Sequence, residues 1–395
     1  MKKFVLIIFF YLFASVSNSN SEDKINIGIF LGFSGLVETL TPSMADSIEL
    51  PFKEIVSLEN FFNNMKFKLS RVDSGCTDIE KTNNEIDGLS KKKLIAIIGG
   101  ACPGISKLVL SKFNLPNKIV MISPADSSFD LNKFEDKKLF FRTVANDTRM
   151  SEILADITKD RGIKKVAITF SNTDYDKNMA LTYKNALENK KIQVTIFKEH
   201  KQKDDNYSKY VSSLAAAGGE ALAIFNEYNT GGKEIVLTSL DSGIFEKFIF
   251  AENMISDDLI NYFENNLKNS FGVLQGSTDK GFKFFEELAI NNGIDPNSPF
   301  VGESYDAASL LILAIKSAGS LKSNLISENL IAVANKPGVK IYPGQIEKAL
   351  KILEKGKPIN YEGATKIELS EDGDANGSYL EIEFKGKKIK IKKER

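Results

Sequence analysis

Short apolar runs alternate with longer amphipathic segments along most of the chain. In the first part, apolar or alternating runs predict strands at 24–31, 66–73, 94–98 and 119–122. Helical spacing of the apolar positions predicts helices at 43–58, 77–90 and 104–112. Strands separated by helices of this length indicate a parallel sheet with right-handed crossovers, so the predicted fold class is α/β.

A second series of the same kind begins after residue 143. Its predicted strands are 166–170, 193–197, 221–225 and 248–250, and its predicted helices are 147–161, 176–189, 207–217 and 233–242. The segments 282–292, 304–318 and 328–334 are mostly helical in pattern. The tail predicts strands at 364–369 and 378–392 with a turn at Asp372-Gly373, and its Lys/Ile alternation at 387–393 suits an edge strand protected by charge.

Two successive α/β series followed by returning segments predict two Rossmann-like lobes. We expect the chain to cross between them near 142–146, near 272–277 and after 361. The first lobe then comprises 22–143 with 277–362, and the second comprises 144–276 with 363–395.

The N-terminal segment has the features of an export signal. Met1-Lys2-Lys3 is followed by an apolar run at 4–16 and a polar stretch at 17–21. The run of thirteen residues is too short to cross a bilayer of about 30 Å as a helix. We therefore predict a cleavable signal peptide at 1–21 and a periplasmic location, the alternative being a short buried helix.

Composition narrows the function classes. The 52 basic residues balance the 52 acidic ones, whereas a nucleic-acid-binding protein should carry a basic surplus. One His and two Cys leave few options for a metal site, and no metal or cofactor is expected. An oxidising compartment would let Cys76 and Cys102 form a disulfide; the alternative is two unpaired buried thiols.

Catalytic motifs are missing from the sequence. There is no G-x-S-x-G elbow and no Walker A loop, and the glycines after the first strand lack the dinucleotide-binding spacing. His200 lies in a polar stretch, Lys198 to Lys201, and is expected at the surface. We therefore expect a protein that is not an enzyme, with a secreted α/β hydrolase as the alternative.

The loops that follow the predicted strands carry the candidate chemistry. In the first series these are the small, polar stretches 32–35, 99–104 and 123–128; in the second they are 174–175, 227–228 and 251–253. Ligands of parallel α/β sheets bind beyond the carboxyl ends of the strands, where helix N-termini suit a carboxylate. Acidic residues there can hold an ammonium group, so the loops predict an interlobe cleft for a small zwitterion. The alternative is that these residues only serve turn geometry.

The sequence resembles a known family at these loops. The segments 24–35, 72–76, 98–104 and 122–125, and then 141–143, 163–175, 218–228 and 304–308, are similar to type I substrate-binding proteins of ABC transporters. The nearest class is the branched-chain amino-acid-binding group. The resemblance implies two lobes, three hinge crossings, closure around an α-amino acid, a monomer, and an ABC permease of the inner membrane as partner. It also implies a disulfide near the cleft.

The resemblance assigns roles to five residues. Ala125 matches a position whose carbonyl binds the ligand ammonium, and Ser127 matches a hydroxyl that binds the carboxylate. Glu252 matches the acid that pairs with the ammonium. Tyr175 and Tyr228 match aromatic contacts from the second lobe.

The sequence departs from the family pattern at two loops. Pro103 stands where a small polar residue often binds the carboxylate, and the Gly104 N–H or the Ser106 hydroxyl would have to replace it. The first loop has Glu38 where an aromatic wall is expected.

Further acids near the predicted cleft bear on the ligand. They are Glu38, Asp126, Glu227 and Glu303. Because unpaired carboxylates in a closed cleft are costly, they indicate a ligand with a polar or cationic side chain. The alternative is that these acids face solvent or pair with Lys. The predicted function is capture of an α-amino acid for an ABC transporter, with another small amide, carboxylate or polyamine, or a sensory role, as alternatives.

Overall fold

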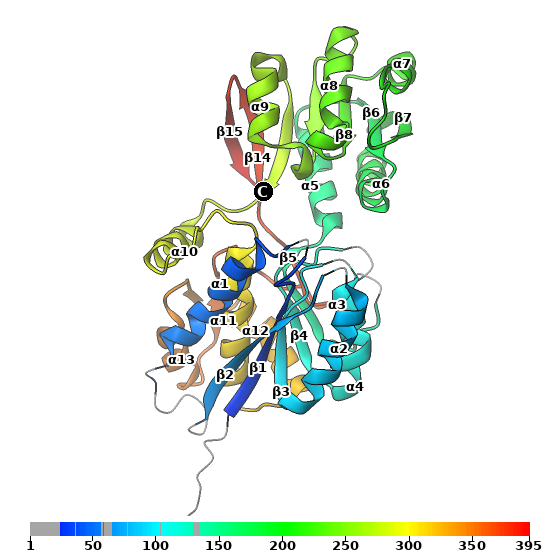
Figure 1. Cartoon of the computed structure of the whole chain (residues 1–395). Coiled ribbons are helices and arrows are strands. Elements are labelled where there is room, and N and C mark those ends of the chain that lie inside the picture. The colour runs from blue at the N-terminus through cyan, green and yellow to red at the C-terminus, as the bar shows by residue number, and fades with distance from the viewer. Residues whose placement is uncertain are drawn as a thin grey trace, which may run out of the picture.

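The computed structural model describes residues 24–395 except 36, 57, 59–64, 77, 103, 129–130 and 132–133. The predicted signal peptide at 1–21 and the departure at Pro103 lie outside the described residues. The described chain forms two α/β lobes joined at one end of each (Figure 1). None of its described helices is both long and apolar enough to cross a membrane.

The first lobe is built on a six-stranded parallel sheet. Its order is β13-β5-β4-β3-β1-β2. The strands are β1 (Lys24–Leu31), β2 (Lys66–Asp73), β3 (Leu94–Gly99), β4 (Val120–Ser123), β5 (Phe140–Ala145) and β13 (Asp374–Ala375). The central strands are almost wholly buried, as expected for a parallel sheet covered on both faces.

Helices cover both faces of this sheet. They are α1 (Thr41–Glu54), α2 (Ile79–Leu89), α3 (Ile105–Val109), α4 (Leu115–Asn117), α10 (Lys280–Asn291), α11 (Val301–Ala318), α12 (Ser323–Ala334) and α13 (Ile346–Leu353). Helix α11 is apolar on nearly every side and is buried along 14 of its 18 residues. It therefore lies inside the lobe, packed between α1 and α12. A two-stranded sheet, β11 (Val339–Ile341) with β12 (Ile359–Tyr361), completes the lobe.

The second lobe has a seven-stranded mixed sheet of order β15-β14-β10-β9-β8-β6-β7. The strands are β6 (Lys165–Ser171), β7 (Gln193–His200), β8 (Ala221–Phe225), β9 (Phe248–Phe250), β10 (Phe271–Gln275), β14 (Tyr379–Lys385) and β15 (Lys388–Glu394). Its helices are α5 (Asp147–Asp160), α6 (Asp174–Asn189), α7 (Ser208–Ala217), α8 (Gly232–Asp241) and α9 (Asp257–Phe263). Strands β14 and β15 are antiparallel, and β15 is the charged edge strand predicted from its Lys/Ile alternation.

The chain crosses between the two sheets three times. The first crossing is at Asn146 between β5 and α5, and the second is at 276–279 between β10 and α10. The third lies at 376–378, because β13 pairs with β5 of the first sheet and β14 belongs to the second. The boundary expected at 363 is therefore wrong by more than ten residues. The strand predicted at 364–369 is also wrong: that segment forms turns and one isolated bridge, Leu369 with Ala375.

The prediction that His200 lies at the surface is wrong. It is 1% exposed, and its ring nitrogens contact the Thr169 hydroxyl at 2.8 Å and the Asn226 amide at 3.2 Å. His200 ends β7, where alternation turns its side chain inward although its neighbours in sequence are charged. Burial lowers its pKa to about 4, so the ring is neutral and structural.

Candidate functional site

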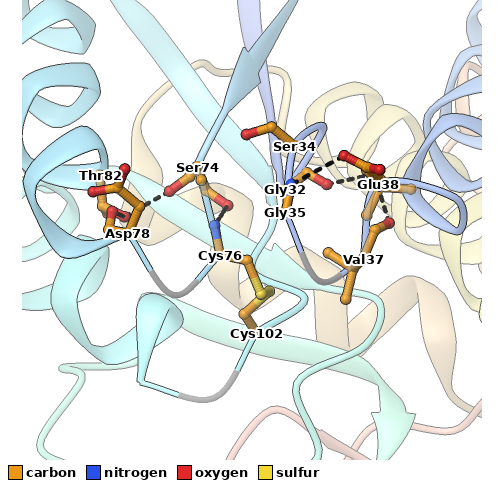
Figure 2. Close-up of a disulfide and its surroundings, with 12 residues drawn as sticks. Gly32, Ser34, Gly35, Val37, Glu38, Ser74, Cys76, Asp78, Thr82 and Cys102 are labelled. Carbon is orange, nitrogen blue, oxygen red and sulfur yellow. Dashed lines mark hydrogen bonds between the residues drawn. A yellow bond between two sulfur atoms is a disulfide. The ribbon is translucent and has the colours of Figure 1, made fainter.

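Three loops of the first lobe are fastened together beside the interlobe region. Cys76, after β2, forms the predicted disulfide with Cys102, after β3, with 5.4 Å between the Cα atoms. Figure 2 shows this bridge next to the loop after β1, where Gly32 allows close approach to Cys76. Asp73 accepts hydrogen bonds from the N–H groups of Phe33 and Gly75, at 2.8 and 3.0 Å. The disulfide and this carboxylate together hold the loops at the carboxyl ends of β1, β2 and β3.

Arg142 organises the next loop and the third crossing. Its guanidinium is fully buried and donates to both carboxylate oxygens of Asp374, at 2.6 and 3.1 Å. It also donates to the carbonyls of Asp126 and Ser128, at 3.3 and 3.2 Å. Because one planar cation serves all these acceptors, it fixes the loop at 124–128 against the hinge.

Asp147 lies in the first crossing, behind this loop. Asn146 caps α5 by accepting the Arg149 N–H at 3.0 Å, which places Asp147 in the first turn of the helix. The Asp147 N–H donates to the Ser127 carbonyl at 3.1 Å, and the Tyr175 hydroxyl donates to its Oδ1 at 3.4 Å. Its Oδ2 is buried without a hydrogen-bond partner among the described residues. Burial raises its pKa to about 7, despite the Ser127 hydrogen bond and the charge of Arg142.

Glu252 and Glu303 approach from the two lobes and share one amide. Glu252 begins the short helix η5 (Glu252–Met254) after β9, and its Oε1 accepts the backbone N–H of Gln275 at 3.4 Å. Glu303 lies in the first turn of α11, and its Oε1 accepts the Gln275 side-chain amide at 2.9 Å. Gln275 therefore connects an acid of the second lobe with an acid of the first.

The electrostatics of these acids follow from their burial. Burial raises the pKa of Glu252 to about 7, and the charge of Asp147 adds to the effect. Burial also raises the pKa of Glu303 to about 7, with Asp306 and Glu252 adding to it. The pKa of the buried Tyr379 hydroxyl is raised as well, first by burial and then by the charges of Glu252 and Asp147. We call Asp147, Glu252 and Glu303 the hinge acids. The charge of Asp147 acts on Glu252, and the charge of Glu252 acts on Glu303, so the three carboxyl groups form one acidic cluster.

The hinge acids form no ion pair among the described residues, although the charge of Arg142 acts on Asp147. Across the part of the chain that the structure describes, no Lys or Arg forms an ion pair with any of them or with Asp126. Asp126 accepts two hydrogen bonds from Ser128 on Oδ1, while its Oδ2 is buried without a partner among those residues. Groups of three or more metal-ligating side chains suited to a metal ion are not found in the described ranges either.

The structure brings together some of the residues proposed from the sequence. Ser127, Tyr175 and Glu252 lie around Asp147. Ala125 is buried two residues before Ser127, and its N–H donates to the Ser123 hydroxyl at 3.3 Å. A cavity of about 10 Å³, lined by Tyr175 and Glu252 among others, has room for one water molecule at most.

Other proposed residues lie elsewhere. Tyr228 is 7% exposed and packs in the core of the second lobe, near Asp258. Ser106 is fully buried against Gly100, with no hydrogen-bond partner for its hydroxyl in the described chain. Gly104 is exposed at the start of α3.

The acids proposed from the sequence divide into two groups. Asp126 and Glu303 are buried, at 4% and 9% exposed. Glu38 and Glu227 are exposed, and Glu38 accepts the Gly35 N–H within its own turn, at 3.3 Å. The alternative that these acids face solvent therefore holds only for Glu38 and Glu227.

Sequence reasoning missed Asp147, Gln275 and Tyr379. Asp147 resembles an ordinary acid at a helix N-terminus, where a carboxylate is expected without any ligand. Gln275 ends β10 and Tyr379 begins β14, and both flank crossings. Their position beside a change of lobe is the one signal that would have found all three.

Comparison with known proteins finds a matching family model and a related sequence. The family model described as "Receptor family ligand binding region" matches residues 44–387. The Leu/Ile/Val-binding protein homolog 3 of Brucella melitensis is 24% identical over 273 residues, which are 67% of this chain and 66% of that relative. The chain thus spans just under two thirds of the length of that relative.

Solved structures share the fold. The branched-chain amino acid transporter substrate-binding protein of Streptococcus pneumoniae, in complex with isoleucine, has a TM-score of 0.67 at 16% identity, covering 94% of this chain and 99% of that one. A solute-binding protein of R. palustris in complex with benzoate has a TM-score of 0.64 at 16% identity, covering 93% and 95%. The two lobes thus have the fold of type I periplasmic binding proteins.

Proposed function

The chain belongs to the family described as "Receptor family ligand binding region", and on this basis we propose that it is the periplasmic solute-binding component of an amino-acid ABC transporter. Its relatives support a solute-binding role. In this proposal it captures an α-amino acid between its lobes as a monomer and delivers it to a permease of the inner membrane. No bond is made or broken, so the protein is not an enzyme.

The hinge acids carry the proposal about the ligand. Three buried carboxylates that form no ion pair are unfavourable, because each loses its hydration when it is ionised. A ligand ammonium beside Glu252 supplies one counter-charge. A second positive charge on the ligand side chain supplies another, next to Glu303 or Asp147. The ligand class is therefore an α-amino acid with a cationic side chain, such as lysine, ornithine or arginine.

The loop at 124–128 is the proposed site of the ligand backbone. The Ala125 carbonyl accepts from the ammonium, and the Ser127 N–H donates to the carboxylate. The Ser127 hydroxyl, which bonds Asp147 in the structure, turns to the ligand carboxylate when the ligand binds. Arg142 holds this loop from behind, which leaves it pre-organised before the ligand arrives. The ring of Tyr175 contributes a wall from the second lobe.

Closure about the three crossings completes the site. Ser127 and Glu303 belong to the first lobe, and Glu252 and Tyr175 belong to the second. A ligand that contacts both sets binds the closed arrangement better than the open one, and this difference in affinity drives the closure.

A simple aromatic carboxylate fits the hinge acids poorly. Benzoate, which a structural neighbour binds, carries only negative charge and would face several carboxylates. A polyamine would satisfy the acids but has no carboxylate to accept hydrogen bonds from the loop at 124–128. Both are useful test ligands, because benzoate tests the carboxylate contacts of the proposed site and a polyamine tests its ammonium contacts.

The experiment is a calorimetric titration of the purified chain with lysine, arginine, glutamine, leucine, putrescine and benzoate. We expect lysine or arginine to bind most tightly, putrescine more weakly, and benzoate not at all. Tight leucine binding without lysine or arginine binding would reject the cationic ligand while leaving the amino-acid transporter role. No binding of any amino acid would reject both.

Matched variants test the site itself. Glu252→Ala should weaken binding of the α-amino acid by roughly 2–5 kcal/mol, because it removes the partner of a buried ammonium. Glu38→Gln changes an exposed acid that bonds within its own turn, and it should change affinity by less than about 0.5 kcal/mol. Unchanged affinity in Glu252→Ala would show that Glu252 does not hold the ligand.

A further inference from the structure

A second cavity lies at the opposite end of the strands in the first lobe's sheet. It has a volume of about 870 Å³ and is bounded by the starts of β3, β4 and β5 and by α12. The proposed amino-acid site uses the carboxyl ends of the strands, whereas the residues that line this cavity lie at the amino ends. In Figure 1 these amino ends point away from the second lobe. Its volume is within the range of about 300–1,000 Å³ that is usual for small-molecule sites.

The wall of this cavity is apolar. Leu94, Ile119 and Leu139 come from the starts of the three strands, and Phe113 and Ile331 close the sides. Leu94, Phe113 and Leu139 belong to the core of the lobe. Such a wall binds an alkyl chain by removing it from water.

The mouth of the cavity is positively charged. Its lining includes five exposed lysines, Lys93, Lys118, Lys137, Lys138 and Lys322. Within the described ranges, none of these lysines forms an ion pair. The lining contains one acid, Glu328. The charge at the mouth is thus complementary to an anion, although the whole chain has a formal net charge of zero.

A buried hydroxyl without a partner lies at the wall of this cavity. Ser327, on the first turns of α12, lines the cavity and is 4% exposed. Its Oγ has no hydrogen-bond partner in the described part of the chain. A buried polar group without a partner is unfavourable, and rotation of the Ser327 side chain toward the cavity would let it donate to an oxygen of a bound anion.

We propose that this cavity binds the anion of a single-chain fatty acid. The alkyl chain lies against the apolar wall, and the carboxylate accepts hydrogen bonds from Ser327 and from the lysines at the mouth. The concave shape favours one enclosed chain over a membrane surface, because a flat bilayer cannot reach the wall of a cavity. The proposal does not depend on the amino-acid site.

The test uses the delipidated full chain and cis-parinaric acid, whose fluorescence increases in an apolar environment. We expect saturable binding at one site per chain and displacement by laurate. Decanoate, shorter by two methylenes, should compete about tenfold less well. Methyl laurate, which lacks the charge, should also compete at least tenfold less well, and saturating lysine or arginine should not compete.

Variants locate the site without disturbing the fold. Lys118 and Lys138 have positive φ values, of 53° and 60°, which asparagine tolerates. Lys118→Asn with Lys138→Asn should therefore weaken laurate binding at least tenfold. Lys191→Asn is the matched control, because Lys191 is exposed with φ of 62° and lies in the second lobe.

A second variant narrows the cavity at its apolar wall. Ile331→Trp should weaken probe binding while the melting temperature reports that the protein is folded. Absence of saturable probe fluorescence would overturn the proposal, as would displacement by lysine or arginine. So would equal competition by laurate and its methyl ester, or binding that neither the lysine pair nor the folded tryptophan variant weakens.

Discussion

Replacing Glu303 by glutamine should stabilise the ligand-free protein at high pH. Glu303 is 9% exposed, and its Oε1 accepts the Gln275 side-chain amide at 2.9 Å. A glutamine at this position keeps an oxygen that can accept the same hydrogen bond and has nearly the same volume. The change therefore removes the negative charge with little effect on packing.

The magnitude follows from the pKa of Glu303. Its ordinary value is 4.5, and burial raises it to about 7 in the folded chain. Between these values the folded state holds a proton that the unfolded state has released, so the stability of the wild type falls as pH rises from about 4.5 to about 7. The loss from this one group is at most about 3 kcal/mol above pH 7. The glutamine variant does not suffer this loss.

The assay is urea unfolding at pH 5 and pH 8, followed by far-ultraviolet circular dichroism because the chain contains no tryptophan. We expect the variant to unfold at a higher urea concentration than the wild type at pH 8 and at nearly the same concentration at pH 5, with similar slopes. A variant that is less stable at pH 8, or a difference that does not change between pH 5 and pH 8, would refute the reasoning.

The same helix offers a control of opposite sign. Asp306, three residues on, is fully buried but accepts hydrogen bonds from the Tyr361 hydroxyl, from the Ala364 N–H and from both donors of Thr365. An asparagine here would turn its own N–H donors toward other donors. Asp306→Asn should therefore destabilise the protein by about 1–3 kcal/mol at pH 5. The loss should be smaller at pH 8, because burial also raises the pKa of Asp306, to about 6, and the variant avoids the cost of ionising this carboxyl. The comparison separates a carboxylate that needs a ligand from one that the fold itself satisfies.

Three further predictions concern binding and stability. Lysine affinity should rise from pH 5.5 to about pH 7.5, and protons should be released on binding. The reason is that a cation favours the ionised forms of the hinge acids, whose pKa values are about 7. Titration heats that are the same in two buffers of different ionisation enthalpy would contradict this prediction. Replacing Cys76 and Cys102 by serine should cost about 3.5 kcal/mol of unfolding free energy, since the bridge closes a loop of 26 residues; urea unfolding without reductant measures it, and an unchanged midpoint would argue against the loop-entropy estimate. Arg142→Met should cost about 3–5 kcal/mol, because it leaves Asp374 and buried carbonyls without their donor; a loss of under 1 kcal/mol in the same assay would show that the pair does not hold the hinge.

The regular elements of the fold were accessible from the sequence where apolar patterns are long. The predicted strands 24–31 and 66–73 coincide with β1 and β2, because polar or glycine-rich segments bound these runs on both sides. The strand β13 has only two residues, Asp374 and Ala375, and no pattern can reveal it. Its place in the first sheet depends on Arg142, which is 232 residues away along the chain. The third boundary therefore required tertiary information.

The candidate site was accessible only in part for a related reason. The loops after the strands could be listed from the pattern, and the disulfide followed from the expected compartment. The sequence could not separate buried acids from solvated ones, because burial depends on what packs over a loop. Glu303 begins a helix that is apolar nearly all round, which is a sign of burial, whereas Glu38 bonds within an exposed turn. Asp147 was hidden by its ordinary position in a first helical turn.

The placement of the hinge acids links ligand charge to the movement of the lobes. Glu252 follows a strand of the second sheet, and Glu303 lies in the first turn of a helix of the first lobe, so repulsion between them is repulsion between the lobes. When both are ionised and no cation is present, closure brings like charges together in a region from which water is leaving, and this opposes closure. A cationic ligand between them reverses the sign of that interaction. A neutral side chain would not, so leucine would have to close the lobes against the repulsion that lysine removes. If the lobes close around the ligand as proposed, the charge of the ligand is selected at the closing step as well as through contacts in the open state. Glu303→Gln should then weaken lysine binding and strengthen leucine binding.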